Sequence, residues 1–558
     1  MMPSHETSRA FVPNMEDYES AYRSFRLEVP EYYNFGFDTV DVWAKEPTKT
    51  ALYWVGDDQT EKQITFAEIK DRSDRLASAL LDLGLRKGDR VLLVMGRVPE
   101  WHVSLLGMLK AGIVAVPGTT QLAPKDLLYR FRIAHCRAVI ADSDVAARVD
   151  TVRGQCPELE VLICLGKSQG NWKQFEALVS SVDLSANLPR TRSSDDALIY
   201  FSSGTAGAPK MVLHTHASYP LGHRLTGRFW LDLQPGDLHW NLSDTGWAKA
   251  AWSTFFGPWS QGATVFAPQM SGKFQPVPVL RMLEKYPVTT LCAPPTAYRL
   301  IIQEDLKKYK FPYLRHCVSA GEPLNPEVIE TWKQATGLTI HDGYGQTEST
   351  CLVGNFRCVP VKPGSMGKPM PGFNISIVDD EGKEVPTGAE GHLAVRVAPN
   401  RPVGLFREYV DAPDLNEAVF RGDWYITGDR GVRDSEGYFW FVGRADDVII
   451  TAGYRVGPFE VESALIEHPA VVEAAAVAKT DEVRGNIIKA FVVLAPNHIP
   501  SQELVHELQE HVKSLTAAYK YPREIEFLKE LPKTISGKIL RRELRERSRT
   551  PSSRRPTP

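Results

Sequence analysis

Short apolar runs alternate with helical patterns along the first part of the chain. The run RVLLVMG at residues 90–96 precedes a helical pattern around residues 103–109, and the apolar run GIVAVPG follows it. The same texture of short buried strands returns in AVIADSD, EVLICLG, ALIYFSS, ATVFAP and VTTLCAPP. Repeated strand–helix–strand units are typical of a largely parallel sheet covered by helices on both faces. Ligands gather where the strands of such a sheet run out into loops, so candidate chemistry is expected there.

The pattern changes between about residues 362 and 441, where Gly and Pro separate alternating strands such as NISIVDDEGKEVPTG, GHLAVRV and GYFWFVG. This pattern predicts antiparallel hairpins or a small barrel. After GRADDVIITAGYRVGP, we expect a helix and a strand in EVESALIEHPAVVEAAAVAK, a strand in FVVLA and a helix in ELVHELQEHVKSL. These elements predict a small α+β domain. We place the domains at residues 1–442 and 443–548, and expect the Arg-, Ser- and Pro-rich residues 549–558 to form a disordered tail.

Composition narrows the class of protein. With 558 residues the chain is too long for one compact core, so at least two domains are expected. Lys and Arg total 65 against 68 for Asp and Glu, and this near balance predicts neither nucleic acid nor an anionic membrane as a partner. The seven cysteines are scattered and form no C-x-x-C pair, which argues against disulfides and thiolate zinc sites and favours an intracellular protein.

Targeting signals are also absent from the pattern. No stretch stays apolar over the roughly 18 residues that a membrane-spanning helix needs, so no transmembrane segment is expected. The start, MMPSHETSRAFVPNMEDYES, lacks a hydrophobic signal core and carries more acidic residues than a typical transit peptide. We therefore expect a cytoplasmic location.

One glycine-broken loop carries the first candidate chemistry. The stretch YFSSGTAGAPKMVLHT at residues 200–215 combines hydroxyl groups, accessible backbone N–H groups and the charge of Lys210, which together suit phosphate oxygens. A Walker A loop requires G-x-x-x-x-G-K-[ST], whereas here Pro209 precedes the lysine and Met211 follows it. The loop is therefore not that of a P-loop NTPase. An isolated segment rich in Gly, Ser and Thr is more often an exposed linker, so the other motifs decide between these interpretations.

Four further motifs follow this loop in a fixed order: DGYGQTE, YITGDRG, GRADDVI and PKTISGK. The set resembles the adenylate-forming enzymes, the superfamily of acyl-CoA synthetases, peptide-synthetase adenylation domains and luciferases. Within it, SDTGW at residues 243–247, YKFPYLRHCVSAGEPL and AYKYPREIEF are most similar to the medium-chain acyl-CoA synthetases. The resemblance extends from about residue 32 to residue 545, which is almost the whole chain.

The resemblance implies both a fold and a reaction. The fold is α/β, with a large N-terminal domain of two αβ-layered subdomains plus a small β-barrel, and a small α+β C-terminal domain that rotates on a hinge at Asp446. In the reaction, a carboxylic acid and ATP give an acyl-adenylate and pyrophosphate, and CoA then displaces AMP to form a thioester. The implied acid is medium-chain fatty, branched or aromatic. Mg²⁺ is the implied cofactor with ATP, and CoA is a co-substrate.

The resemblance also assigns the nucleotide site, in which the charge at the transferred phosphate must be neutralised. The loop that surrounds the β- and γ-phosphates comprises Ser202, Ser203, Gly204, Thr205, Ala206, Gly207, Ala208, Pro209 and Lys210. Thr347 hydrogen-bonds the α-phosphate, and Glu348 is a ligand for Mg²⁺. Asp429 accepts both ribose hydroxyls and Arg444 makes a second ribose or phosphate contact. The adenine lies between Tyr344 and the pair Gly321–Glu322. The remaining members are Pro323, Asp342, Gly343, Gly345 and Gln346.

Each of these residues has an ordinary alternative. A Thr-Glu pair alone is more often a helix N-cap than a metal site, because Thr caps helices and an early Glu complements the dipole. GDRG is a plausible turn by itself. A single loop lysine such as Lys538 in TISGKI is usually just solvated. In the family, however, the matching lysine bridges the acyl carboxylate and the α-phosphate, so the implied catalytic residues are Lys538, Thr347 and Glu348.

The CoA site and the acyl pocket rest on the same resemblance. After rotation about Asp446 the lysine leaves and a CoA tunnel forms. The implied CoA contacts are Gln121, Ala452, Gly453, Tyr454, Arg484, Lys513, Tyr521 and Arg523, with the arginines and the lysine serving the phosphates. The family often has Asn and Ser where this chain has Thr451 and Ala452, which puts the side-chain contacts there in doubt.

Short-chain acetyl-CoA synthetases place Trp at the position of Gly345, so glycine predicts a pocket floor open to acids longer than acetate. Trp247 is a second candidate for the acyl pocket, although an ordinary core aromatic residue explains it equally well. Two other functions stay open from the sequence. One is an adenylating enzyme that passes the acyl group to a carrier-protein phosphopantetheine or to an amine, which the CoA candidates oppose. The other is a degenerate nucleotide-binding protein, which the presence of the catalytic residues opposes.

Overall fold

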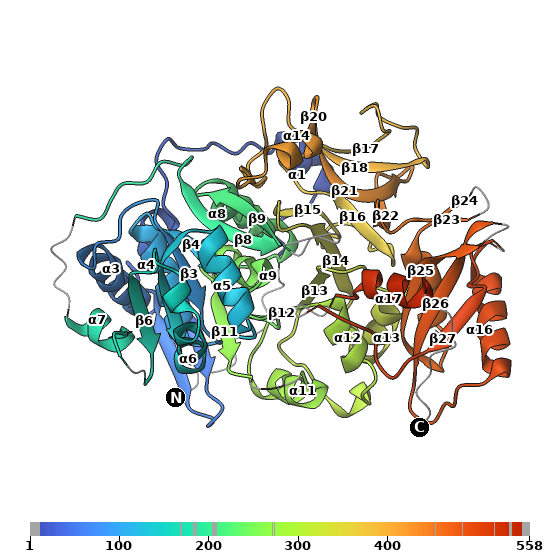
Figure 1. Cartoon of the computed structure of the whole chain (residues 1–558), viewed down its shortest axis with the longest axis horizontal. Helices are drawn as coiled ribbons and strands as arrows, with labels where there is room; N and C mark the ends of the chain where they lie inside the picture. Colours follow the sequence, from blue (N-terminus) through green and yellow to red (C-terminus); the bar gives the residue numbers. More distant parts are fainter. Residues whose placement is uncertain are drawn as a thin grey trace.

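A computed structural model describes residues 12–167, 170–181, 187–202, 209–270, 272, 274–451, 454–481, 484–517, 519–534 and 538–549. Figure 1 shows a large N-terminal part built on two central sheets and a smaller C-terminal part at its side. Most of the expected tail lies outside the described residues. Arg549, the first residue of that tail, ends the last helix, α17 (Arg541–Arg549). Nothing among the described helices has both the length and the apolar content to cross a membrane.

The first αβ unit surrounds an eight-stranded sheet in the order β19-β9-β8-β4-β3-β5-β6-β7. Its parallel strands are β3 (Arg90–Val94), β4 (Val114–Pro117), β5 (Cys136–Asp142), β6 (Val161–Leu165), β7 (Lys173–Gln174) and β8 (Asp196–Ser202). The antiparallel edge consists of β9 (Lys210–Thr215) and β19 (Glu408–Tyr409). Because side chains alternate along a strand, Val91 and Leu93 pack into the core on one face while Leu92 and Val94 pack into the other. The strands predicted from the apolar runs are confirmed here.

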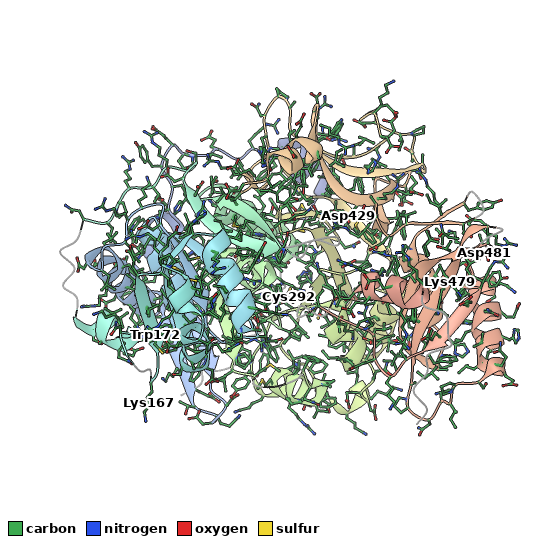
Figure 2. The ribbon with its side chains drawn as sticks, viewed as in Figure 1. Lys167, Trp172, Cys292, Asp429, Lys479 and Asp481 are labelled. Carbon is green, nitrogen blue, oxygen red and sulfur yellow. The ribbon has the colours of Figure 1, made fainter. Side chains whose placement is uncertain are left out.

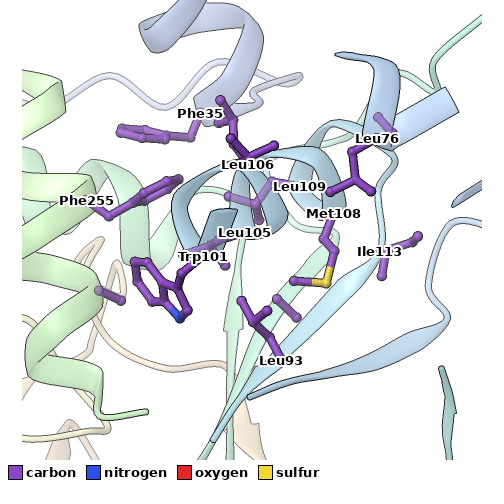
Figure 3. Close-up of a cluster of buried hydrophobic side chains, with 14 of the residues drawn as sticks. Phe35, Leu76, Leu93, Trp101, Leu105, Leu106, Met108, Leu109, Ile113 and Phe255 are labelled. Atoms are coloured by element: carbon purple, nitrogen blue, oxygen red, sulfur yellow. The ribbon is translucent and has the colours of Figure 1, made fainter. Parts of the chain in front are cut away.

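Helices cover both faces of this sheet, as the strand–helix–strand pattern predicted. On one face lie α3 (Phe66–Asp82), α4 (Pro99–Lys110) and α7 (Phe175–Ser181), and on the other lie α5 (Pro124–Ile133) and α6 (Ser143–Asp150). Helix α4 is apolar almost all round because it is buried between this unit and the next. Figure 3 shows Trp101 and Leu106 of α4 beside Phe35 and Phe255, which come from distant parts of the chain.

The second sheet has fourteen strands among the described residues, and its path is β17-β18-β21-β22-β16-β15-β14-β13-β12-β10-β11-β1-β2 with β20 attached to β21. Its parallel part consists of β1 (Thr50–Val55), β10 (Leu238–Asn241), β11 (Thr264–Pro268), β12 (Thr290–Ala293), β13 (His316–Ala320) and β14 (Ile340–Gly345). The edge strand β2 (Glu61–Thr65) is antiparallel to β1. The helices associated with this unit include α11 (Pro276–Lys285), α12 (Pro295–Ile301) and α13 (Pro326–Thr336).

The predicted hairpin region forms the antiparallel end of this second sheet. Its strands are β15 (Cys351–Gly354), β16 (Ser365–Pro369), β17 (Ile375–Val378), β18 (Glu390–Arg396), β20 (Phe420–Arg421), β21 (Trp424–Arg433) and β22 (Phe439–Arg444). β16 joins the two parts because it pairs with β15 on one side and β22 on the other. This contact requires a glycine: at Gly367 φ is 97°, and a Cβ would lie 2.2 Å from the main chain of Gly354.

The N-terminal segment reaches across to these antiparallel strands. Helix α1 (Tyr18–Ser24) begins at Asp17, whose side chain accepts a hydrogen bond from the Ser20 N–H. The hydroxyl of Tyr18 donates to Pro369 O at 2.9 Å, and that of Tyr22 donates to Phe373 O at 2.8 Å. Figure 1 shows α1 beside the orange and yellow strands, away from the rest of the early chain. Residues close to the start of the chain therefore form hydrogen bonds with the antiparallel end of the second sheet and stabilise it.

The C-terminal domain has its own three-stranded sheet, in the order β25-β26-β27. The strands are β25 (Val471–Asp481), β26 (Gly485–Leu494) and β27 (Glu524–Phe527), and they pack with α15 (Pro458–Ile466), α16 (Gln502–Leu515) and α17. A short hairpin, β23 (Ile449–Thr451) and β24 (Tyr454–Val456), precedes them. The sequence pattern predicted α15, β25, β26 and α16, whereas β23, β24, β27 and α17 were not predicted. The expected α/β fold class is confirmed.

Candidate active site

A cavity of about 2110 Å³ lies where the parallel strands of both sheets run out into loops. Ser202 at the end of β8, Ser243 after β10, Pro294 after β12 and Gly321 after β13 all line it. The C-terminal domain contributes Lys538 to the same wall. The location is the one that the parallel pattern predicted, at the carboxyl ends of the strands and between the two domains.

Asp429 on β21 lines the cavity, and Figure 2 labels it beside the antiparallel strands. Only 3% of this residue is exposed. Its Oδ2 accepts hydrogen bonds from the hydroxyl of Tyr344 at 2.5 Å and from Nε2 of Gln346 at 2.6 Å. Its Oδ1 lies 3.3 Å from Nε of Arg444 in an ion pair, and it accepts no hydrogen bond from the described residues. The carboxylate therefore keeps one oxygen able to accept hydrogen bonds from a ligand.

Electrostatics at Asp429 follow from this placement. Burial raises the pKa of the Asp429 carboxyl. Four weaker effects lower this pKa: the charge of Arg444, the hydrogen bonds from Tyr344 and Gln346 and, least of all, the charge of Lys538. The lysine predicted to act in catalysis thus lines the same cavity as the carboxylate predicted to hold the ribose, and its charge acts on that carboxylate. The structure brings these two together although 109 positions separate them in the sequence numbering (538 − 429).

The residues predicted to enclose the adenine come from adjacent strands. β13 and β14 pair in parallel with Ala320 opposite Gly343, which places Gly321 and Tyr344 at the same edge of the sheet. Gly321 has φ of 101°, a left-handed turn that favours glycine. The Glu322 carboxylate accepts hydrogen bonds from Thr296 Oγ1 at 2.9 Å and Arg299 Nη2 at 3.0 Å. Tyr344, Gly321, Glu322 and the neighbouring Pro323 all line the cavity.

Thr347 and Glu348 lie on the cavity wall, directly after β14. No helix begins here, because the chain turns and continues into β15. The helix-cap explanation for this pair is therefore wrong. The neighbouring Asp342 is buried in the same wall, where burial raises its carboxyl pKa well above the usual range and the Gly343 N–H donates to it at 3.0 Å. Gly343, Gly345 and Gln346 also line the cavity.

The phosphate loop is described only at its two ends. β8 ends at Ser202 and β9 begins at Lys210, and these two residues face each other in the antiparallel pairing. Both line the cavity. Pro209 accepts a hydrogen bond from the Tyr129 hydroxyl at 3.3 Å through its main-chain oxygen. The other predicted loop residues, Ser203, Gly204, Thr205, Ala206, Gly207 and Ala208, lie outside the described residues.

Lys538 of the C-terminal domain is held by hydrogen bonds to Thr534. Its N–H donates to Thr534 Oγ1 at 3.1 Å, and its main-chain oxygen accepts from the Thr534 N–H at 2.7 Å. Lys533 and Ile539 form a β-bridge beside this pair. The predicted hinge residue, Asp446, lines the same cavity as Lys538. One hydrogen bond between the domains lies nearby, from Asn325 Nδ2 to Ser463 Oγ at 3.0 Å.

The predicted CoA contacts are not brought together. Gln121 lines the cavity, but Tyr454, Arg484, Lys513, Tyr521 and Arg523 of the C-terminal domain do not. Three of them form a cluster of their own, with Lys513 Nζ 4.3 Å and Arg523 Cζ 5.0 Å from the centre of the Tyr521 ring. Tyr454 stacks on Tyr519 at 4.2 Å. Ala452 and Gly453 lie outside the described residues.

The cavity also has aromatic lining residues, of which the sequence predicted only one. Trp247 lines it as expected, and so do Trp230, Trp252 and His223, which were not predicted. The Trp252 ring lies 5.7 Å from the His223 ring and 5.8 Å from the Trp230 ring. None of the three belongs to a motif, and an apolar run gives no sign of which of its aromatic residues faces a cavity.

Lys249 is a further residue of this wall that was not predicted. It follows SDTGW by two positions, so its closeness to a motif was the only available signal. Its Nζ donates to Ala320 O at 2.8 Å, and burial lowers the pKa of the ammonium group. Packing requires a glycine at position 246 of SDTGW, because a Cβ on Gly246 would lie 2.0 Å from Thr119 N.

The open pocket floor predicted at Gly345 needs a correction. Gly345 does line the cavity. A Cβ at this position, however, would lie 2.4 Å from Thr350 O and 3.3 Å from Cys351 Cα, so it would meet backbone rather than open space. Glycine is required here by the close approach of the main chain. A larger side chain can enter only if the turn that leads into β15 moves.

Family profiles match both domains of the chain. The profile described as "AMP-binding enzyme" matches residues 40–410, and the profile described as "AMP-binding enzyme C-terminal domain" matches residues 460–538. The chain belongs to the AMP-binding enzyme family. Within this family, acyl-coenzyme A synthetase ACSM3, mitochondrial, of Homo sapiens is 48% identical over 554 residues, which cover 97% of this chain and 94% of that protein. Acyl-coenzyme A synthetase ACSM5, mitochondrial, of Mus musculus is 47% identical over 531 residues, covering 93% and 91%.

Solved structures agree with this family. The anthranilate CoA ligase AuaEII, crystallised with anthranoyl-AMP, is 33% identical with a TM-score of 0.85, and the match covers 93% of this chain and 98% of that one. A benzoate CoA ligase from Burkholderia xenovorans is 31% identical with a TM-score of 0.81, covering 92% and 100%. The family profiles, the relatives and the solved structures together identify this chain as an adenylate-forming acyl-CoA ligase that uses a carboxylic acid, ATP and CoA.

One expectation from the sequence is wrong. A cytoplasmic location was inferred from the composition of the first residues, whereas the relatives just described are mitochondrial proteins. Similarity along nearly the whole chain is stronger evidence than the charge content of one short segment, because targeting segments vary widely in composition.

Proposed function

We propose that this AMP-forming ligase activates carboxylic acids longer than acetate, in the range of medium-chain fatty, branched or aromatic acids, with ATP bound as its magnesium complex. The observation that carries the proposal is that one cavity is lined by Asp429, Glu348 and Lys538 and also by Trp230 and Trp252. A wall of large aromatic side chains suits an apolar tail better than a methyl group. The mitochondrial relatives support a mitochondrial location.

In the proposed adenylation step, the chain's own residues hold the two reactants in line. The free oxygen of Asp429 accepts the ribose hydroxyls, and Thr347 donates to an α-phosphate oxygen. Lys538 places its charge between the acyl carboxylate and the α-phosphate, where negative charge develops as the carboxylate attacks phosphorus and pyrophosphate leaves. The arrangement of Lys538 toward Asp429 supports this assignment.

Glu348 suits a magnesium ion that arrives with ATP. Among the described residues, no group of three or more His, Cys, Asp or Glu side chains could hold a metal ion alone. Mg²⁺ usually takes only one or two carboxylates together with substrate phosphates and water. A single carboxylate beside the phosphate loop fits that pattern. The ion would neutralise phosphate charge during adenylation.

Thioester formation requires a second arrangement of the domains. The proposed CoA residues Lys513, Tyr521 and Arg523 lie on the C-terminal domain outside the cavity, while Gln121 lies inside it. Rotation about Asp446 would withdraw Lys538 and bring these groups toward the acyl-adenylate. This proposal explains why one domain carries both a catalytic lysine and CoA contacts on different surfaces.

The deciding experiment is a thioester assay with free CoA across linear acids from C2 to C12 and a set of branched and aromatic acids. We expect the highest kcat/KM for acids longer than propionate. Acid-dependent ATP–pyrophosphate exchange is measured in parallel. Exchange without thioester formation from free CoA would favour transfer to a carrier protein or an amine. Absence of exchange with every acid would contradict ligase activity altogether.

A further inference from the structure

Two side chains that the sequence did not assign to the site contact the Thr347–Glu348 pair directly. His214 lies on β9, and its Nε2 is 2.7 Å from Thr347 O. Tyr409 lies on β19, and its hydroxyl is 2.9 Å from Glu348 Oε1. Neither residue belongs to the phosphate loop or to DGYGQTE. Both come from strands of the first sheet, whereas the Thr-Glu pair follows a strand of the second.

The protonation of His214 is set by its surroundings. A carbonyl oxygen can only accept, so Nε2 carries the proton and donates to Thr347 O, while Nδ1 lies 3.3 Å from Ser218 Oγ. The residue is fully buried. Burial lowers the pKa of the imidazole to about 4, so the ring stays neutral at ordinary pH. His214 is therefore a fixed donor to the main chain of Thr347.

The Tyr409 side chain is also fixed by burial and by its hydrogen bond to Glu348. Only 4% of the residue is exposed. A carboxylate oxygen can only accept, so the phenol hydroxyl of Tyr409 donates this hydrogen bond to Glu348. Lys210, at the end of the phosphate loop, places its Nζ 5.3 Å from the centre of the Tyr409 ring. One aromatic side chain thus lies between the cation of the phosphate loop and the carboxylate of Glu348.

Backbone hydrogen bonds join the same elements. β19 pairs with β9, with Tyr409 opposite Val212. Just before β19, the Phe406 N–H donates to Glu348 O at 2.8 Å and Gly404 O accepts from the Thr350 N–H at 2.9 Å. At Gly404 φ is 106°, and a Cβ would lie 2.6 Å from Thr350 Oγ1, so this approach needs glycine. The segment before β19 therefore lies between β9 and the Thr-Glu pair.

We propose that His214 and Tyr409 are positioning residues for adenylation. His214 fixes the main chain of Thr347, and Tyr409 fixes the Glu348 carboxylate relative to Lys210. β9 begins at Lys210, the last residue of the phosphate loop, and carries His214. The loop and the Thr-Glu pair are therefore connected through the same strand, and the distance between them is kept when ATP binds. The inference rests on the roles proposed above for Thr347 and Glu348. Small displacements matter at such a site, since a shift of about 1 Å can cost about 100-fold in rate.

The first test uses His214→Leu, which removes the donor, and His214→Gln, which offers an amide donor in its place. We expect His214→Leu to lower the rate of acid-dependent ATP–pyrophosphate exchange about 10- to 100-fold, an effect of mispositioning. Thioester formation from supplied acyl-AMP should fall much less, because CoA attacks the acyl carbon and the phosphorus beside Thr347 is no longer the atom under attack. His214→Gln should recover part of the lost exchange rate.

His102 supplies the matched control. It is buried, its Nε2 lies 3.1 Å from Thr254 O, and burial lowers its pKa to about 4, as for His214. His102 does not line the cavity. Melting temperatures are measured for all variants. A similar loss of exchange in His102→Leu, or equal damage to both half-reactions in His214→Leu, would reduce His214 to a structural role. If His214→Leu does not fold, the same comparison is made between His214→Gln and His102→Gln.

The second test uses Tyr409→Phe, which removes only the hydroxyl, with ATP binding measured by calorimetry. We expect the gain in ATP affinity on adding Mg²⁺ to fall about 3- to 10-fold, since the carboxylate loses its fixed orientation. Affinity for ATP in EDTA should be unchanged. Tyr53→Phe is the control. The Tyr53 hydroxyl likewise donates to a carboxylate, Glu61 Oε2, at 2.6 Å, but neither residue lines the cavity.

The outcomes separate this inference from the proposed function. If the unaltered enzyme shows no acid-dependent exchange, the proposed function fails. If that exchange is normal while Tyr409→Phe keeps the full effect of Mg²⁺ and His214→Leu keeps the full exchange rate, the proposed function stands and the positioning roles are wrong. A loss of ATP affinity with and without Mg²⁺ alike would also contradict the role of Tyr409.

Discussion

The nucleotide end of the cavity and the predicted CoA site differ in how completely the structure assembles them. Tyr344 and Gln346 converge on Asp429, Arg444 pairs with it, and Lys538 of the C-terminal domain lines the same cavity. The CoA candidates are divided between the cavity and a separate surface of the C-terminal domain. The difference supports the proposal that the two half-reactions use different positions of the domains. We interpret the position seen here as the one for adenylation.

The strongest test of this comparison is Lys538→Ala. If the lysine belongs to the assembled end, adenylation should lose about 10²- to 10³-fold in rate, as expected for removal of a positioned charge at the transition state. Thioester formation from supplied acyl-AMP should continue, because the lysine has left the site by then. The two half-reactions are measured separately. Equal losses in both would place Lys538 outside the adenylation site.

Gly345→Trp examines the acyl end beside the nucleotide. Each buried methylene contributes about 0.8 kcal/mol, so excluding three or four of them should lower kcat/KM for hexanoate about 100-fold relative to acetate. The close approach to Thr350 O means that any side chain also strains the turn. Gly345→Ala therefore serves as control, and should affect short and long acids alike. A tryptophan variant that keeps the original chain-length profile would exclude Gly345 from the pocket floor.

The substitution Asp446→Pro tests whether the C-terminal domain rotates between adenylation at the nucleotide end and thioester formation with CoA. Proline fixes φ near −65°, and a hinge must change its backbone angles, so thioester formation should fall at least about tenfold more than adenylation. Single-turnover measurements of each half-reaction give the ratio. Proportionate loss in both, with an unchanged melting temperature, would argue against rotation at this residue.

The smallest effect is expected at the CoA surface. Lys513→Ala should raise the KM for CoA about fivefold at low salt, because an exposed ion pair with a phosphate is worth about 1 kcal/mol or less. The effect should shrink as salt screens the charges. ATP–pyrophosphate exchange should not change. Lys529→Ala, another exposed lysine of the same domain, is the control, and an equal effect there would mean that no specific CoA contact is made at Lys513.

The sequence predicted most of the fold because buried strands carry a local signal. The run around Val91 and Leu93 is apolar at every position, since both faces of the strand are covered. The junction at β16 could not be predicted, because pairing between distant strands leaves no local pattern. The motifs assigned Asp429 and Lys538 to one site, and both residues line one cavity.

The residues between the motifs needed the structure. Tyr409 lies in a strand of two residues, too short for any periodicity. His214 is one of several buried histidines, and only its contact with Thr347 O distinguishes it. The acyl wall shows the same limit, because nothing in the spacing of Trp230 and Trp252 indicates which apolar side chains line a cavity. The role of Gly345 was predicted from space alone and missed the backbone beside it.

The junction strand β16 also determines how the enzyme should respond to heat. Because β16 bonds to β15 and β22 together, the antiparallel end cannot separate without opening the sheet that surrounds the nucleotide end. The sheet of β25, β26 and β27 shares no strand with it. Scanning calorimetry should therefore resolve two cooperative transitions, a large one for the N-terminal domain and a small one for the C-terminal domain. Saturating ATP should move the large transition upward, and a third, independent transition would mean that the antiparallel end is a cooperative unit of its own.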